Sequence, residues 1–331
     1  MRLGRLSLRR GGQVGLLLPV LLLSWAQAAP LRVAVISDLN GSYGSTRYPA
    51  AVPRAVASIV AGQADLVLST GDMVAGQRPQ PPLEDAALAA MWSAFHRLVT
   101  NPLGAAGIPL AITPGNHDAS AYPPYRVERD RFAAQWAARR PDVAFVDDAH
   151  YPFYYAFALR DVLFVSLDVT RPGRIEQDQR QWLEALLRRA GDRYRHRVAF
   201  SHLPLHPFAR GREREVSGDL ELARTLAGHG VELYLSGHHH AFYPGYRDGV
   251  RYVSQACLGA GPRALLGTTT PAPRAVTWVE FDGAEVRVTA LSGPHFRQPI
   301  DLAGLPRSVG RGGALLLRDD LRPGAAGQPP P

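Results

Sequence analysis

Histidine, aspartate and asparagine side chains gather at five points along the 331-residue chain, each directly after a short apolar run. Mixed imidazole and carboxylate ligands suit Zn²⁺, Mn²⁺ or iron. The pattern therefore predicts a metal site. The candidate residues at these points are Asp38, Asn40, Asp72, Asn116, His117, Asp118, His202, His206, His238, His239 and His240.

The chemistry that such a site could perform is hydrolysis of a phosphate ester. A metal ion lowers the pKa of its bound water from 15.7 to about 7, so that hydroxide is available near neutral pH. Two ions roughly 3.5–4 Å apart can hold both the attacking and the leaving oxygen of a phosphoryl group. They also neutralise charge on the phosphoryl oxygens, which this reaction requires.

The five apolar runs are typical of short strands buried on both faces. Helix-like stretches lie between them, and strands that alternate with helices predict an α/β fold, in which ligands bind beyond the carboxyl ends of the strands. The predicted strands are 31–37, 66–70, 109–113, 197–201 and 231–236, and the predicted helices are 83–99, 177–190 and 220–227. Residues 153–168 and 275–290 have the pattern of antiparallel strand pairs.

The order of these motifs resembles that of the calcineurin-like metallophosphoesterases. The resemblance extends from about Leu31 to Phe296 and implies an α/β fold, a β-sandwich flanked by helices in α/β/β/α layers, with phosphoric ester hydrolase activity. The matching motifs are Asp38-Leu39-Asn40, Gly71-Asp72, Gly115-Asn116-His117-Asp118, His202 and Gly237-His238-His239-His240. Segments 153–157, 164–168 and 181–183 resemble the purple acid phosphatase branch.

The resemblance implies a centre of two divalent or trivalent metal ions, of Mn, Fe or Zn. Asp72 would bridge the two ions. Asp38 and His240 would hold the first ion, with Asn40 as a possible oxygen ligand. Hydroxide bound to this centre would attack a small phosphate-ester substrate, with a phosphomonoester favoured and a phosphodiester possible.

The remaining roles follow from the same resemblance. Asn116, His202 and His238 would hold the second ion. His117 would lie beside the leaving group, either as an acid or as an electrostatic stabiliser of the transition state. Asp118 would orient an imidazole from outside the ligand set, because such partners fix the tautomer and direction of the ring.

Two positions depart from the family pattern. Asn40 stands where His or Gly is common, and Ala75 stands where the purple acid phosphatase branch has Tyr. An amide oxygen binds metals more weakly than imidazole, so we expect a weaker first site and no tyrosinate-to-iron colour. These departures motivate an alternative, a metal-binding or ligand-binding protein of this fold without turnover.

Composition excludes several other chemistries. The chain has no lysine, so neither a P-loop lysine nor a Schiff-base lysine can occur, and its single cysteine, Cys257, excludes cysteine-based zinc sites. Without residues 1–29, which hold four arginines and no acid, the formal net charge falls from +8 to +4. No nucleic-acid partner is therefore expected, which weakens a nuclease reading.

The chain divides into three predicted parts. Residues 1–29 have the basic start, short apolar run and small-residue end of a signal peptide cleaved near Ala28 or Ala29, which predicts export to the periplasm or secretion. The alternative is that residues 1–29 remain attached as an uncleaved membrane anchor. After cleavage, the mature form should have no stable membrane span. Residues 30–302 form the metallophosphoesterase domain, and 303–331 a mobile tail rich in Gly, Pro and Arg.

Several further residues allow two readings. His239 should point away from the metals, whereas His206 either contacts phosphate or caps a loop. Residues 259–261 read as a tight turn. Residues that either line the substrate entrance or form a solvated loop are Tyr122, Tyr125, Arg126 and Arg129. A charge-alternating run predicted to be solvated holds Arg210, Arg212, Glu213, Arg214 and Glu215.

Overall fold

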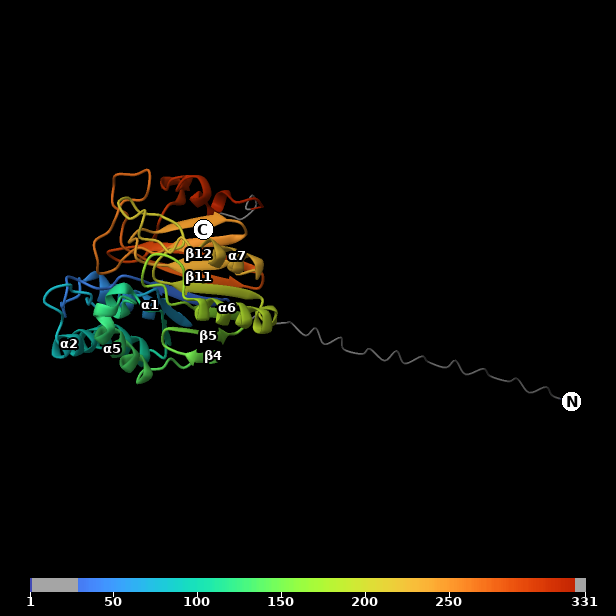
Figure 1. Ribbon diagram of the computed structural model, residues 1–331. Coiled ribbons are helices and arrows are strands. Elements are labelled where there is room, and N and C mark those ends of the chain that lie inside the picture. Colours follow the sequence, from blue (N-terminus) through green and yellow to red (C-terminus); the bar gives the residue numbers. More distant parts are fainter. Residues whose placement is uncertain (2–28, 325–331) are drawn as a thin grey trace.

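The predicted strands lie in two sheets of a computed structural model, which describes Met1 and residues 29–324 (Figure 1). The six-stranded sheet contains β1 (Leu31–Ile36), β2 (Leu66–Ser69), β3 (Leu110–Ile112), β11 (Ala275–Asp282), β12 (Glu285–Ser292) and β13 (Gln298–Pro299). The nine-stranded sheet contains β4 (Ala144–His150), β5 (Tyr154–Leu159), β6 (Val162–Ser166), β7 (His196–Ser201), β8 (Leu233–Ser236), β9 (Tyr243–Arg247), β10 (Val250–Ser254), β14 (Ser308–Val309) and β15 (Leu316–Arg318).

Both sheets contain a run of parallel strands, which reaches the β3 edge of the six-stranded sheet and lies inside the nine-stranded one. The strand orders are β13-β12-β11-β1-β2-β3 and β14-β15-β9-β10-β8-β7-β6-β5-β4. β1, β2 and β3 are parallel neighbours, as are β6, β7, β8 and β10. The two predicted antiparallel pairs are confirmed as β5 with β6 and β11 with β12.

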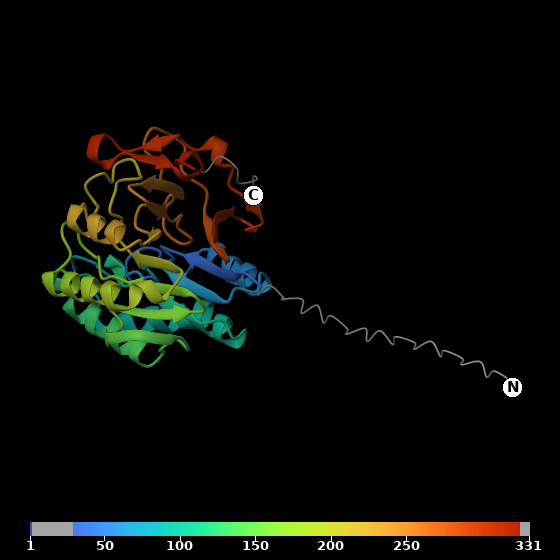
Figure 2. The same cartoon turned by 90° about the vertical axis from the view of Figure 1, so that its right-hand side faces the viewer.

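Helices cover the outer face of each sheet (Figure 1 and Figure 2). The α-helices are α1 (Ala51–Ala61), α2 (Asp85–Phe95), α3 (Asn101–Ala105), α4 (Asn116–Ala119), α5 (Arg126–Ala137), α6 (Gln177–Ala190) and α7 (Leu220–Gly228). A π-helical turn, η1 (His96–Thr100), continues α2. Short 3-10 helices are η2 (Pro123–Tyr125), η3 (Gly191–Arg193), η4 (Leu302–Gly304), η5 (Gly312–Ala314) and η6 (Asp319–Leu321). The three predicted helices are thus confirmed to within a few residues.

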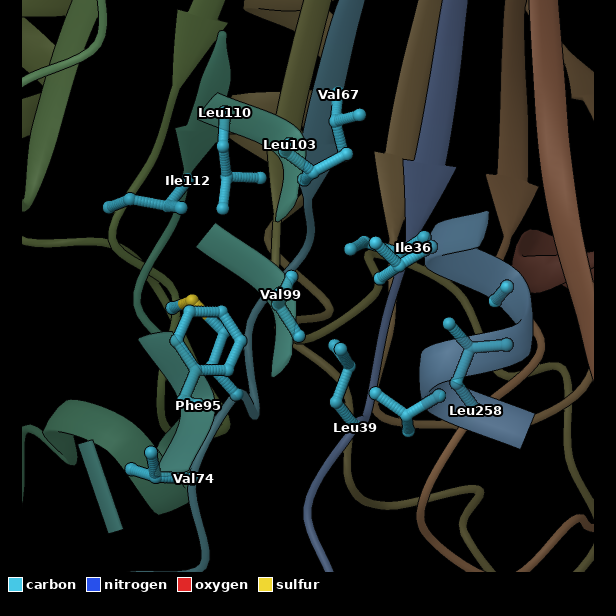
Figure 3. Close-up of a cluster of buried hydrophobic side chains, with 14 of the residues drawn as sticks. Ile36, Leu39, Val67, Val74, Phe95, Val99, Leu103, Leu110, Ile112 and Leu258 are labelled. Atoms are coloured by element: carbon cyan, nitrogen blue, oxygen red, sulfur yellow. The ribbon is translucent and has the colours of Figure 1, made fainter. Parts of the chain in front are cut away.

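Three buried clusters join the four layers. On the six-stranded sheet, strand residues such as Ile36 and Val67 pack against Phe95 of α2 and Val99 of η1 (Figure 3). A second cluster joins the nine-stranded sheet to α6 and α7. The third lies between the sheets. This α/β/β/α arrangement confirms the predicted fold class.

Alternation along each strand explains why the predicted runs are continuously apolar. In β1, Val33 and Val35 face the other sheet, whereas Ala34 and Ile36 face the helices. In β7, Val198 faces the other sheet and its neighbours alternate in the same way. Since both faces are buried, polar residues become acceptable only where a strand ends.

The C-terminal segment corrects the predicted mobile tail. Within residues 303–324, β14 pairs with β15, and β15 pairs with β9 at the edge of the nine-stranded sheet. Val309 and Leu316 are buried, and Arg318 donates a hydrogen bond to the Leu305 carbonyl at 2.7 Å. These contacts order a segment whose composition alone suggested mobility. Residues 325–331 lie outside the described residues.

The predicted signal peptide falls almost entirely on residues 2–28, which lie outside the described residues, so it stays a prediction. In the part of the chain that the structure describes, none of the helices has the length and apolar character needed to cross a bilayer.

Candidate metal centre

The ends of five parallel strands bring the predicted residues together. Because parallel neighbours end at the same edge of a sheet, their following residues converge there. The six-stranded sheet delivers Asp38, Asn40, Asp72, Asn116 and His117, and the nine-stranded sheet delivers His202, His238 and His240. The site thus spans the edges of both sheets.

Four of these residues adopt a backbone conformation that is rare without glycine. Asp38, Asp72, His238 and His240 have φ angles of 51°, 55°, 65° and 55°. Each such residue costs about 1–3 kcal/mol, and residues of this kind cluster at functional sites. Hydrogen bonds compensate locally; for example, the Asp38 amide donates to the Gly71 carbonyl at 3.1 Å.

One group of ligand atoms surrounds His202. Its Nε2 lies 3.3 Å from Asp72 Oδ1, 2.9 Å from Asn116 Oδ1 and 3.2 Å from His238 Nδ1. Asp38, Asp72 and His202 are buried, and each offers a ligand atom within 4.8 Å of those of the other two. Carboxylate, amide and imidazole groups together form a ligand set suited to a transition metal.

The outer hydrogen bonds of the histidines fix which ring nitrogens carry protons. His202 Nδ1 donates to the Thr70 carbonyl at 2.8 Å, and His238 Nε2 donates to Glu215 Oε2 at 3.0 Å. In the neutral rings, His202 Nε2 and His238 Nδ1 therefore face each other with lone pairs. Either a proton or a metal ion between the two nitrogens would satisfy both, and metal-binding histidines have their outer nitrogens held in this way.

A second group surrounds Asp38. His240 donates from Nδ1 to the Gly261 carbonyl at 2.8 Å, so Nε2 is the ring nitrogen that faces Asp38 Oδ1, 3.1 Å away. Among the described residues, Asn40 Oδ1 is buried without a hydrogen-bond partner. An orphaned buried oxygen is costly, and a cation would satisfy it. Asn40 thus fits the predicted role of oxygen ligand.

Electrostatics point to a cation in the same place. Burial opposes charge on His202, but the carboxylates of Asp72 and Asp38 raise its pKa to about 9. Despite its burial, the nearby His240 and His202 hold the pKa of Asp38 below its ordinary value. The negative potential that attracts a proton to His202 would equally attract a metal ion.

Asp118 accepts hydrogen bonds from two backbone amides. Its Oδ1 accepts from the Val74 amide at 2.8 Å, and its Oδ2 accepts from the Gly115 amide at 3.1 Å. Burial and the Asp72 charge raise the pKa of Asp118 to about 8. Asp118 therefore ties two strand-end loops together, and its role in orienting an imidazole stays a prediction. The His117 ring donates from Nδ1 to the Gly76 carbonyl at 2.8 Å.

His239 and His206, for which the sequence allowed two interpretations, both have structural contacts. The His239 ring accepts from the Phe208 amide at 3.1 Å and meets the Glu215 carbonyl at 3.1 Å, so it points away from the ligand atoms as predicted. His206 is buried edge-on against Tyr252, with ring centroids 4.7 Å apart. It packs in the core and does not line the cavity at the metal ligands.

The comparisons with known proteins agree with this geometry. Residues 31–242 match the family model for calcineurin-like phosphoesterase. The chain belongs to the calcineurin-like phosphoesterase family. It is accordingly a metallophosphoesterase, an enzyme of metal-dependent phosphoester hydrolysis, with a candidate metal site at Asp38, Asp72 and His202.

Solved structures with the same fold are distant in sequence. A dimetal phosphatase from Danio rerio has a TM-score of 0.55 and 17% identity, covering 79% of this chain and 96% of its own. Purple acid phosphatase PPD1 from yellow lupin (Lupinus luteus) seeds has a TM-score of 0.61 and 16% identity, covering 80% and 52%. GAP50, the anchor in the inner membrane complex of Plasmodium, has a TM-score of 0.54 and 12% identity, covering 80% and 85%. Comparison with curated proteins gave no match.

The ligand atoms of this metallophosphoesterase open into a cavity of about 760 Å³, a size suited to a small ligand. One wall contains His117 together with Tyr43, whose ring centroid lies 5.4 Å from that of His117. The second half of the chain contributes Arg212, Glu215 and Arg263 to the lining of the cavity. Of the loop residues predicted for the entrance, Tyr122 lines the cavity, whereas Arg129 instead pairs with Asp168.

Glu215 and Gln77 are functional candidates that the sequence did not indicate. Glu215 accepts from His238, which lowers the pKa of Glu215 to about 2, and it also pairs with Arg212. Gln77 Oε1 accepts from Asn116 Nδ2 at 2.7 Å, which leaves Asn116 Oδ1 directed at His202. The charge-alternating run that was predicted to be solvated therefore has two parts. Arg212 and Glu215 line the cavity, whereas Arg210, Glu213 and Arg214 are exposed.

Replacing Glu215 with Gln should weaken metal binding by about 10- to 100-fold, the usual effect of losing a carboxylate behind a metal-binding histidine. The amide keeps the size of the side chain but supports the His238 Nε2–H less strongly. Metal titration of the apoprotein by calorimetry would measure the change. Glu213→Gln is the matched control, because Glu213 is exposed in the same loop. Equal affinities in both variants would contradict the assignment.

Proposed function

We propose that this phosphoesterase hydrolyses phosphomonoesters with two metal ions held in the cavity. Asp38, Asn40 and His240 would hold the first, and the group around His202 would hold the second, namely Asn116, His202 and His238. Asp72 would bridge them, since it belongs to the cluster with both Asp38 and His202. The observation that supports the proposal is the convergence of Asp72 Oδ1, Asn116 Oδ1 and His238 Nδ1 on His202 Nε2, at 3.3, 2.9 and 3.2 Å.

The ions would supply Lewis acidity and a water acidic enough to attack near neutral pH. A side chain of the protein, His117, would protonate or stabilise the leaving group. His117 Nε2 lies 4.0 Å from Asp72 Oδ2, and the ring is partly exposed to the cavity. Because Nδ1 is held by the Gly76 carbonyl, only Nε2 is available to donate a proton or to stabilise charge on the departing oxygen.

The alternative is a protein of this fold that binds metal or ligand without turnover. It is supported by the amide ligand Asn40 and by the similar fold of GAP50, which is described as an anchor. The complete set of converging ligand atoms favours the enzyme, because a binding role alone does not need His117 beside them.

The deciding experiment is elemental analysis of the purified protein beside hydrolysis assays with a chromogenic phosphomonoester and phosphodiester. We expect close to two metals per chain, with faster turnover of the monoester. One metal or none, with no turnover of either ester after addition of Mn²⁺, Zn²⁺ or Fe²⁺, would favour the binding protein. Faster turnover of the diester would reject the monoester preference.

We also propose that the enzyme is exported, on the basis of the arginines and the apolar run in residues 1–29. Sequencing the N-terminus of the protein recovered from a bacterial periplasm or culture medium would test this. A start near Ala29 or Pro30 is expected, and a start at Met1 would contradict cleavage.

A further inference from the structure

Arg263 lies in the wall of the cavity, immediately beside the Asp38 half of the site. Its amide donates to the His240 carbonyl at 3.4 Å, and the Gly261 carbonyl in the same loop receives the His240 ring proton. The loop also approaches the strand end closely, since a Cβ on Gly259 would lie 1.6 Å from the Leu39 carbonyl oxygen. The backbone at Arg263 is therefore held close to the segments that carry Asp38 and His240.

The guanidinium of Arg263 forms no close ion pair among the described residues, although the charges of Asp38 and Glu215 favour its charged form. Its Nε is buried without a hydrogen-bond partner, and no described carboxylate forms an ion pair with it. Glu215, an acidic residue of the same wall, is already engaged by Arg212 and His238. Burial and the neighbouring Arg212 lower the pKa of Arg263, yet an arginine remains a cation at neutral pH. A partly buried, unpaired guanidinium is costly unless an anion approaches it.

Charge balance indicates which anion. Two divalent ions would bring four positive charges, and the carboxylates of Asp38 and Asp72 remove two of them. A hydroxide nucleophile removes a third, so that a singly charged phosphodiester would already balance the site. Arg212 and Glu215 cancel each other. Arg263 adds one positive charge, and the site is then balanced by the two negative charges of a phosphomonoester.

We propose that Arg263 is a specificity-determining residue, which contacts the phosphoryl group and favours dianionic phosphomonoesters over monoanionic phosphodiesters. This inference rests on the proposed function and identifies a residue behind its substrate preference. The planar guanidinium suits the role because its donors match phosphate oxygens in pairs.

The test compares Arg263→Gln with the natural protein and with Arg210→Gln, an exposed arginine of the neighbouring loop. Hydrogen bonds to charged groups contribute about 1.5–3 kcal/mol, so kcat/KM for p-nitrophenyl phosphate should fall about 10- to 100-fold. For bis(p-nitrophenyl) phosphate, whose single negative charge would balance the site without Arg263, kcat/KM should fall less than about 3-fold. Arg263→Lys, which keeps the charge, should restore part of the preference. Arg210→Gln should change neither value.

Calorimetric titration of the metal-loaded proteins with inorganic phosphate provides a readout without turnover. Arg263→Gln should bind phosphate about 10-fold more weakly or worse, with unchanged metal content. Equal losses for both esters, unchanged phosphate affinity, or loss of metal from the variant would each overturn the proposal. If the natural protein hydrolyses neither ester, the proposed function fails, and the phosphate titration still decides whether Arg263 binds the anion.

Discussion

Asp72→Asn should lower kcat/KM by more than about 10³-fold, because this change removes the carboxylate that would bridge the two metal ions of the proposed centre. Asp72 belongs to the cluster with Asp38 and His202, and it lies 3.3 Å from the His202 ring. The amide is nearly isosteric but carries no charge. One oxygen still accepts from the His117 amide, at 2.9 Å in the natural protein, so the loop should persist. Elemental analysis and initial rates measure the two effects.

Metal content should fall together with activity in this variant. Asp192→Asn is the control, since Asp192 is fully exposed at the end of α6. Circular dichroism and thermal melting would show that both variants are folded. An Asp72→Asn protein that keeps two metals and a natural rate would remove Asp72 from the bridging role.

The second large effect is expected at His117, where the loss should fall on catalysis and not on metal binding. Substitution with Ala should reduce kcat about 10²- to 10⁴-fold, the usual contribution of a positioned acid or base. His117 Nε2 stands 4.0 Å from Asp72 Oδ2, outside the contacts among the ligand atoms, so the metal content should be unchanged. Steady-state kinetics and elemental analysis on one preparation separate the two quantities.

The leaving group distinguishes the two roles proposed for His117. A proton donor matters most when the departing alcohol is a poor leaving group, so an alkyl phosphate should lose more rate than p-nitrophenyl phosphate. Equal losses would indicate electrostatic stabilisation instead. His295→Ala provides the control, because His295 is exposed. A His117→Ala protein without bound metal would show that His117 belongs to the ligand set.

The five strand ends could be predicted because each strand is buried on both faces. Continuous apolar runs such as those around Val35 and Val198 end abruptly where a polar residue first becomes acceptable. The end of each run therefore indicates both where the strand ends and where a candidate metal ligand follows. Order along the chain then identified the family, and parallel pairing brought the strand ends together. The tautomers of His202 and His240, in contrast, depend on hydrogen bonds to the backbone carbonyls of Thr70 and Gly261. The direction of a backbone carbonyl cannot be predicted from the type of its residue.

Contacts between loops explain what the sequence did not predict. Glu215 meets His238 from 23 residues away, within a run whose alternating charges suggested a solvated surface. Arg263 follows residues 259–261, which were interpreted only as a tight turn, so the sequence did not mark it as a cavity residue. β14 and β15 have two and three residues, too few for a period to be visible, and their Gly-rich surroundings suggested mobility. The structure orders them through pairing with β9, which lies more than 60 residues earlier.

The division of the ligand atoms between the two sheets has a consequence for the durability of the protein. Asp38, Asp72 and Asn116 follow strands of one sheet, and His202 and His238 follow strands of the other. Apart from this edge, the apolar seam between the sheets is the main contact that joins them. A bound ion would therefore act as a cross-link at the open end of the sandwich. A metal ion present at 100 times its dissociation constant increases the free energy of unfolding by about 2.7 kcal/mol. The concentration of free metal would therefore affect the stability of the protein as well as its activity.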